Sequence, residues 1–211
     1  MRLDTFIARQ LRKPSGLIGR LFVGKSLNKS NGPLEDMGLE LMDLKPGYHV
    51  LEIGFGNGRL ISKMAPRLHE GTITGIDISD VMIEQARKRN QDFIQSGKVK
   101  LLKASVEDIP AEDEYFDRIF TANTIYFWPD PGSDIGEVFR TLKTGGCFYC
   151  GMRVREDMLR LGPILKNRDI FKNLYTLDEI TAFFKSAGFS QVDYHVKQRK
   201  QFADVIVVGQ K

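Results

Sequence analysis

The stretch His49–Gly58 constrains the fold more than any other part of the chain. Its sequence is His-Val-Leu-Glu-Ile-Gly-Phe-Gly-Asn-Gly, an apolar run that ends in three alternating glycines, and a helical pattern follows. Such a run is typical of a buried strand that turns tightly into a helix. Glycine accepts unusual backbone angles and leaves the backbone open to a ligand, and the helix start offers free N–H groups. We therefore expect a nucleoside-bearing cofactor across this turn.

Strand and helix patterns alternate from this turn to about residue 152. Alternation of this kind predicts an α/β fold with a parallel sheet that is covered by helices on both faces. The expected strands are 48–53, 72–78, 99–104, 116–122 and 147–152, with Gly145-Gly146 separating the last strand from the helix before it. The expected helices are one that Pro33 opens and Lys45-Pro-Gly ends, followed by 58–67, 79–95 and 133–142.

The end of the chain has a different pattern. Residues 155–165 are compatible with a helix or an insertion, because Gly162-Pro163 weakens the helical pattern. A helix is expected over 176–187, with Thr176 as its cap and Gly188 as its stop. Two strands follow, 190–196 and 203–209. The gap between them is too short for a crossover helix, so they must form an antiparallel hairpin.

The N-terminal segment 1–33 has no place in this sheet. Its first 30 residues carry seven Lys or Arg and one acid, although the net charge of the whole 211-residue chain is only +4. We expect a helical lid here and a single domain over 34–211. The basic arm is compatible with an ordinary solvated surface or with contact to acidic lipid, nucleic acid or an anionic substrate. Five apolar residues of this segment are expected to cover the side of the site where a substrate would accept the transferred group. They are Phe6, Leu17, Ile18, Leu21 and Phe22.

Targeting signals and a disulfide framework are absent from the sequence pattern. No apolar run approaches the ~20 residues that a membrane span needs, and the first residues lack a signal-peptide core. The chain has two cysteines, so a reducing cytoplasm is the expected location. Cys147 and Cys150 lie three apart on an expected strand and should point to opposite faces, which argues against a metal site.

The spacing around the glycine turn narrows the choice of nucleotide. The dinucleotide fingerprint is Gly-x-Gly-x-x-Gly, and here Arg59 occupies the position of its third glycine. Glu52, just before the turn, would repel a pyrophosphate and suits a ligand end that carries positive charge, such as an ammonium. Asp77 ends the second strand, where an acid can accept hydrogen bonds from both ribose hydroxyls.

Several motifs now point to one family. In chain order they are Val50-Leu-Glu-Ile-Gly-Phe-Gly-Asn-Gly58, Gly75-Ile-Asp77-Ile-Ser, Glu107-Asp-Ile-Pro110, Tyr115-Phe-Asp-Arg-Ile-Phe120, Leu142-Lys-Thr-Gly-Gly146 and Ala187-Gly-Phe189. Together they resemble a class I S-adenosylmethionine-dependent methyltransferase of the small-molecule, quinone- and sterol-methylating type. The resemblance implies a Rossmann-like seven-stranded sheet of order 3-2-1-4-5-7-6 with strand 7 antiparallel. It also implies S-adenosylmethionine as cofactor and S-adenosylhomocysteine as product.

Site residues are carried over from the resemblance by position. The glycines would lie under the methionine part, Glu52 would hold its ammonium, and Asp77 would bind the ribose. Ser105 stands where many relatives have an acid that binds the adenine amino group, which leaves that contact open between the Val106 N–H and nearby groups. The expected cofactor-binding residues are Glu52, Gly54, Gly56, Gly58, Asp77, Ile78, Met82, Ser105, Val106, Glu107 and Asn123.

The acceptor side is less specific in the sequence. Methyl transfer from a sulfonium needs alignment and exclusion of water more than acid–base chemistry. None of the three histidines falls at the carboxyl edge of the sheet, so no general base is expected. Aromatic residues after the fourth strand could contact the sulfonium or acceptor, or simply pack in the core. The candidates are Asn123 and Tyr126 for catalysis, and Tyr126, Trp128, Met152 and Arg153 for the acceptor.

The main expectation is therefore methyl transfer to a small, apolar or lipid-like acceptor by a monomer or homodimer. The basic arm keeps a nucleic-acid or protein methyltransferase as an alternative, although the chain lacks the Asn-Pro-Pro-aromatic pattern of amino-methylating nucleic-acid enzymes. A non-catalytic cofactor-binding homologue is a further alternative. A nicotinamide oxidoreductase conflicts with the glycine spacing.

Overall fold

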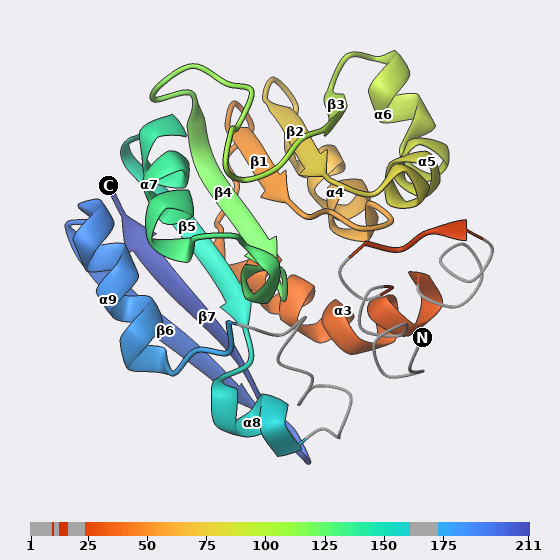
Figure 1. Ribbon diagram of the computed structural model, residues 1–211. Helices are drawn as coiled ribbons and strands as arrows, with labels where there is room; N and C mark the ends of the chain where they lie inside the picture. The colour runs from red at the N-terminus through yellow and green to blue at the C-terminus, as the bar shows by residue number, and fades with distance from the viewer. Residues whose placement is uncertain (1–9, 11–12, 17–23, 161–172) are drawn as a thin grey trace.

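Seven strands form one sheet in the order β3-β2-β1-β4-β5-β7-β6 (Figure 1). The computed structural model describes residues 10, 13–16, 24–160 and 173–211. The first five strands pair in parallel, and β7 is antiparallel to both β5 and β6. The expected sheet order and terminal hairpin are thus confirmed. The strands are β1 His49–Ile53, β2 Thr72–Asp77, β3 Val99–Lys103, β4 Phe116–Ala122, β5 Leu142–Met152, β6 Gln191–Gln198 and β7 Ala203–Gln210.

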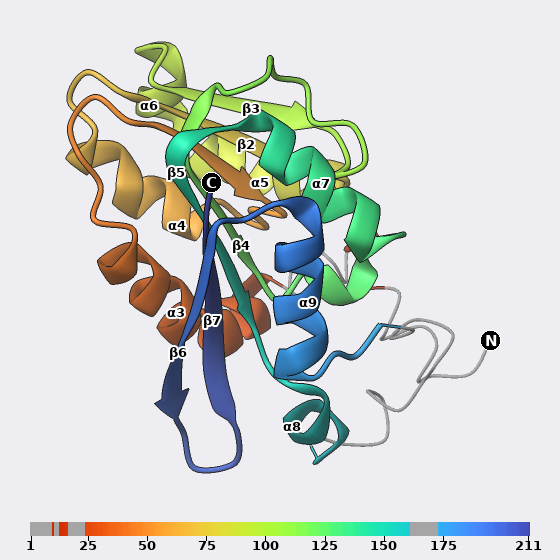
Figure 2. The ribbon, with the colours of Figure 1, turned by 90° about the vertical axis from the view of Figure 1, so that its left-hand side faces the viewer.

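Helices cover both faces of the sheet, as Figure 2 shows, with α3 and α4 on one side and α7 and α9 on the other. The α-helices of the described residues are α3 Gly24–Leu41, α4 Arg59–Met64, α5 Asp80–Arg89, α6 Gln91–Gln95, α7 Pro131–Thr141, α8 Arg155–Arg160 and α9 Leu177–Ala187. Two short 3₁₀ helices are η2 Ala65–Arg67 and η3 Ile125–Phe127.

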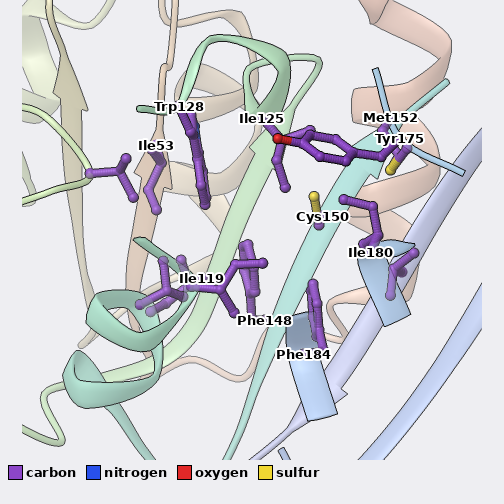
Figure 3. Close-up of a cluster of buried hydrophobic side chains, with 14 of the residues drawn as sticks. Ile53, Ile119, Ile125, Trp128, Phe148, Cys150, Met152, Tyr175, Ile180 and Phe184 are labelled. Atoms are coloured by element: carbon purple, nitrogen blue, oxygen red, sulfur yellow. The ribbon is translucent and has the colours of Figure 1, made fainter. Parts of the chain in front are cut away.

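Each face of the sheet has its own hydrophobic core. On the α7 and α9 face, Phe148 of β5 stacks on Phe184 of α9 with ring centroids 5.1 Å apart, and Trp128 lies 6.4 Å from Phe148 in a near-parallel arrangement (Figure 3). On the other face, Leu34 and Met42 belong to one cluster of buried side chains with residues of α4 and α5. Burial on both faces explains why β1 is an almost continuous apolar run in the sequence.

Helix α3 corrects one boundary. The sequence suggests that Pro33 opens this helix, whereas the helix begins at Gly24 and contains Pro33 in its interior. Proline has a helical φ, so here it removes one backbone hydrogen bond without ending the helix. The helix also runs through the expected boundary between segment 1–33 and the domain over 34–211.

The expected single helix over 79–95 is two helices that meet at Asn90. Asn90 is almost fully buried, and its amide donates to the carbonyl oxygens of Gly58, at 3.1 Å, and Ala86, at 3.0 Å. An asparagine side chain that bonds to backbone groups competes with helix continuation. The break between α5 and α6 therefore lies where the chain is tied to the end of the glycine turn.

Strand β5 also differs from the expected 147–152, because it already begins at Leu142. Phe116 pairs with Leu142 and Arg118 pairs with Cys147, so the register shifts across the two glycines. Gly145 has a φ of +79°, a backbone conformation that most residues avoid. The glycines form an irregularity within the strand instead of separating it from α7.

Two parts of the chain are not fully covered by the described residues. Of segment 1–33, Gln10, residues 13–16 and the start of α3 are described, and the five expected lid residues lie outside them. Of 155–165, the described part is helix α8. Among the described residues, no helix has the length and apolar character to cross a membrane.

The start of α9 provides a test of the capping signal. Thr176 accepts a hydrogen bond from the Glu179 N–H at 3.2 Å, and Glu179 accepts one from the Thr176 N–H at 2.8 Å. We predict that Thr176→Ala lowers the free energy of unfolding by about 1 kcal/mol, the usual value of such a cap. Urea denaturation measures this. Thr181→Ala inside the same helix is the control, and an equal loss there would contradict the capping role.

Candidate cofactor and acceptor site

Three glycines shape the turn after β1, each for its own reason. Gly54, Gly56 and Gly58 have φ values of +69°, +53° and +71°. A Cβ on Gly54 would collide with Thr124 Cγ2, and one on Gly58 would lie 2.5 Å from Asn90 Nδ2. A Cβ on Gly56 would meet nothing within 4 Å. The first and third glycines are therefore required by packing, and the middle one faces open space where a ligand can approach the backbone.

Asp77, at the end of β2, holds the turn from the side. One carboxylate oxygen accepts the Gly56 N–H at 3.0 Å, and the other accepts the Ser79 N–H at 2.8 Å. Burial raises the pKa of Asp77 to about 6, although these N–H groups oppose the rise. Each carboxylate oxygen has a second acceptor position, so Asp77 can still receive ribose hydroxyls. A single carboxylate thus fixes the turn and remains able to bind the expected ribose.

Glu52, on β1, is a buried acid. It is 4% exposed, and no described residue donates a hydrogen bond to its Oε2 atom. Burial first, and then the charges of Glu35 and Asp77, raise the pKa of Glu52 well above its ordinary value. An acid in this state gains from a cation placed beside it. The surroundings of Glu52 fit the ammonium of a methionine-bearing cofactor better than any anionic group.

Glu35 and Arg59 complete this region. Arg59, the residue that breaks the dinucleotide fingerprint, lies in an ion pair with Glu35 of α3 at 2.6 Å and with Asp36 at 3.0 Å. The pairs join α4 to α3 beside the turn. Burial raises the pKa of Glu35, and the Arg59 hydrogen bond opposes the rise. Sequence reasoning missed Glu35, because a lone acid on a helix carries no motif.

The expected adenine side lies at the start of α5 and after β3. Ser79 caps α5 by accepting the Met82 N–H at 3.3 Å, and its hydroxyl donates to the Pro14 carbonyl at 2.7 Å. Part of the N-terminal segment therefore lies directly beside Asp77. The lid itself stays a prediction, because its apolar residues lie outside the described part of the chain.

The remaining adenine candidates occupy the same edge of the sheet. Ile78 is half-buried and Val106 is buried. The Ser105 hydroxyl donates to Glu107 at 2.9 Å. This bond places an acid one side chain away from the position that family members fill with an acid. The roles of these residues, and of Met82, toward adenine stay predictions.

A directional hydrogen-bond chain links the turn to the end of β4. The Thr121 hydroxyl donates to the Ile53 carbonyl at 2.8 Å, so the Thr124 hydroxyl must donate to Thr121. The Trp128 indole N–H then donates to Thr124 at 3.1 Å. The methyl group of the same Thr124 leaves no room for a side chain at Gly54. Sequence reasoning missed both threonines, because Thr121 bonds to Ile53 and Thr124 packs against Gly54, and both contacts join residues that lie far apart along the chain.

Asn123 has a strained backbone and a well-defined side chain. Its φ is +56°, unusual for a non-glycine residue, and its N–H donates to Gly151 at 2.8 Å. Its amide nitrogen donates to Asn31 at 3.0 Å, and its amide oxygen is 3.2 Å from the Tyr126 hydroxyl. Strain that the surroundings maintain is frequent at functional sites. Asn123 therefore remains the first candidate at the acceptor edge.

The other residues expected to contact the acceptor are too buried to line an open acceptor site. Tyr126 and Trp128 are 2% and 4% exposed, and Met152 is fully buried. The Tyr126 hydroxyl is bonded to the backbone of Arg153, and burial raises the pKa of Tyr126 although this hydrogen bond opposes the rise. The Arg153 guanidinium lies over the Phe202 ring and 3.4 Å from Asp204. These contacts support packing roles, and direct acceptor contacts by these residues stay predictions.

His49 lies away from this edge, and the two cysteines pack in the cores. His49 begins β1 at the opposite edge of the sheet and contacts Thr72 at 2.8 Å. Cys147 and Cys150 pack into the cores on opposite faces. Among the described residues, no cluster of His, Cys, Asp and Glu is suited to a metal ion.

Asp77 gives the first prediction about the cofactor. Asp77→Ala should weaken S-adenosylmethionine binding by about 1.5–3 kcal/mol, roughly 10- to 150-fold, because a charged acceptor and the anchor of the Gly56 N–H are both lost. Isothermal titration calorimetry measures the change. Asp80→Asn is the matched control, since Asp80 is exposed and paired with Lys103 on the surface. Unchanged affinity in Asp77→Ala would remove Asp77 from the site.

Glu52 gives a prediction with opposite effects on stability and binding. The raised pKa means that protonated Glu52 contributes stability fully below pH 4.5, and this contribution is lost as the pH rises through the folded-state pKa. Glu52→Gln should therefore raise the melting temperature of the cofactor-free protein at pH 8 and weaken cofactor binding. Thermal melts with and without S-adenosylmethionine measure both. The exposed Glu70→Gln is the control, and a Glu52→Gln variant that binds normally would refute the role of Glu52.

Comparisons with known proteins agree with this geometry. Residues 51–150 match a family model described as a methyltransferase domain. The chain is 26% identical to the uncharacterized methyltransferase YdaC of Bacillus subtilis, over 90% of this chain and 98% of that protein. It is 27% identical to the ubiquinone/menaquinone biosynthesis C-methyltransferase UbiE of Rickettsia bellii, over 69% of this chain and 70% of that protein.

A solved structure supports the fold. A SAM-dependent methyltransferase from Aquifex aeolicus superposes with a TM-score of 0.69 at 21% identity, over 88% of this chain and 95% of that chain. The sheet order, the glycine turn with its two acids and the matched domain agree with one another. Residues 51–150 thus form a methyltransferase domain, and the chain is similar to class I S-adenosylmethionine-dependent methyltransferases in sequence and sheet order.

Proposed function

We propose that this methyltransferase acts on a small, apolar acceptor of the hydroquinone or lipid-like class. The observation that carries the proposal is the chemistry of the edge where β4 and β5 end. The polar side chains described at this edge include the half-buried Asn123 amide, which contacts the buried Tyr126 hydroxyl, and burial keeps that phenol protonated by raising its pKa. Such groups orient an acceptor and do not remove protons from it. They suit an acceptor that is already electron-rich, such as a hydroquinone ring.

In this proposal some residues bind the cofactor and others align the acceptor with it. When bound, the cofactor supplies an electrophilic methyl group on a sulfonium. Glu52 and Asp77 fix its two ends by charge and hydrogen bonds, and the backbone of Gly56 passes beneath it. Asn123 orients the acceptor for in-line attack, and the segment around Pro14 helps to exclude water from the ribose side.

The relatives support the same acceptor class. The Rickettsia protein is named for C-methylation in ubiquinone and menaquinone biosynthesis, and this chain covers 70% of its length. A polar macromolecular acceptor is the competing proposal, and the basic residues 1–30 are its support. The same arm could also bring the enzyme to an acidic membrane surface where apolar acceptors dissolve.

An acceptor assay separates these proposals. Transfer of labelled methyl from S-adenosylmethionine should occur to prenylated hydroquinones in detergent and not to transfer RNA or a mixed protein substrate. Scintillation counting of the extracted lipid measures it. Transfer to RNA that falls steeply as salt rises would favour the competing proposal instead. Cofactor binding without transfer to any substrate would favour a non-catalytic homologue.

Asn123→Gly serves as the matched variant in this assay. Glycine keeps the positive φ and removes the amide, so the fold should be retained while turnover at saturating cofactor falls at least about tenfold, the size of a lost orienting contact. Glu114→Gly is the control, because Glu114 is exposed, also has a positive φ of +54°, and precedes β4 at the opposite edge of the sheet. Equal turnover in both variants would contradict the orienting role of Asn123.

A further inference from the structure

Strand β6 is an unusual edge of the sheet. Seven of its eight residues are exposed and Val192 alone is half-buried. Tyr194 is 56% exposed and Val196 is 46% exposed, and they are two of the three exposed large hydrophobic side chains among the described residues. Figure 2 shows β6 at the outer margin, with no described strand beyond it. A long edge with exposed apolar side chains is a template for further strand pairing.

The backbone groups that point outward from β6 can be assigned. The Arg199 N–H donates to the Phe202 carbonyl, in the same register that pairs His195 with Ile206. Alternate residues of an antiparallel strand bond to the same neighbour. The odd-numbered residues of β6 therefore bond to β7, and Tyr194 and Val196 direct their N–H and C=O groups outward.

The edge is held rigidly from its tip. The Arg199 guanidinium lies 3.1 Å from the fully buried Asp204 and over the Phe202 ring. The Arg153 guanidinium also lies over this ring, 4.1 Å from its centroid. The hairpin is thus fixed to the end of β5, and β6 presents its outward groups in one geometry.

We propose that β6 pairs antiparallel with β6 of a second copy of this chain, about a two-fold axis through His195. This register places Asp193 opposite Lys197 of the partner copy on both sides of the axis. It also places Tyr194 opposite Val196, so their outward backbone groups bond to each other. Opposite charges and aromatic–β-branched pairs stabilise directly facing positions. One continuous sheet then runs through both copies.

The opposite edge of the sheet, strand β3, differs from β6 in its charges. Strand β3 carries the exposed Lys100 and Lys103 and no acid, so pairing of two copies there would bring like charges together. Lysine is a common protection of edges. On β6, Asp193 keeps an exposed carboxylate that Gln191 contacts at 2.6 Å, and among the described residues Lys197 forms no ion pair within its own chain. The complementary charges of Asp193 and Lys197 therefore favour pairing at β6 over pairing at β3. Because both charges lie on the same strand, the partner that they favour is a second copy of this chain.

Disulfide trapping tests the register. Across a two-fold axis at residue 195, the two Cα atoms form a non-hydrogen-bonded pair about 4.5 Å apart, within disulfide range. His195→Cys in the full chain should form a covalent dimer under mild oxidation, measured by non-reducing electrophoresis. Tyr194→Cys is the matched control. In the proposed register position 194 faces position 196 of the partner copy, and it would face itself only if the two strands were shifted relative to each other. Preferred trapping at Tyr194→Cys, or none at either site, would overturn the proposal.

Charge reversal tests the pairing without a covalent bond. Asp193→Lys or Lys197→Asp alone creates two like-charged pairs and should weaken dimerisation about tenfold, measured by sedimentation equilibrium. The double variant restores opposite charges and should recover the dimer. Lys100→Glu on β3 is the control for net charge, and melting temperatures confirm folding. A monomeric wild-type protein, or a double variant as weak as either single one, would overturn the proposal.

Discussion

The carboxylate of Asp77 is the contact on which the site depends. It ends β2, and its two oxygens hold the Gly56 N–H of the turn and the Ser79 N–H at the start of α5. One buried group thereby sets the distance between the first two strand-to-helix connections. A buried carboxylate is costly unless it is hydrogen-bonded, and these N–H groups offset that cost. Burial nevertheless raises the pKa of Asp77 to about 6, so these N–H groups offset the cost only in part.

The turn is fixed from two further directions. Asn90 breaks the helix after β2 and bonds to Gly58, whereas Thr124 packs against Gly54 from the end of β4. The middle glycine is left with open space. Glu52, on β1 just before the turn, remains a buried acid whose pKa is raised by burial first and then by the charges of Glu35 and Asp77. A buried acid next to other acids favours a cationic ligand group beside Glu52, and this role of Glu52 stays a prediction.

Much of this could be predicted because the determining signals are local. The apolar run of β1, the capping residues of α9 and the short gap between β6 and β7 each fix an element through neighbouring residues. The sheet order followed from the family resemblance and the hairpin. One predicted boundary was wrong because a distant contact decided it: the side chain of Asn90 bonds to a residue 32 positions away and breaks the helix after β2.

The sequence by itself determined the fold class, the cofactor class and the positions of Glu52, Asp77 and the glycines, because spacing and strand ends depend on neighbouring residues. Only the tertiary structure decided why each glycine is needed, since the atoms that exclude a side chain at Gly54 come from the segment after β4. It likewise decided that Tyr126 and Trp128 are buried and that β6 is exposed on both faces. Burial depends on which elements meet across the sheet, and a linear pattern does not contain that information.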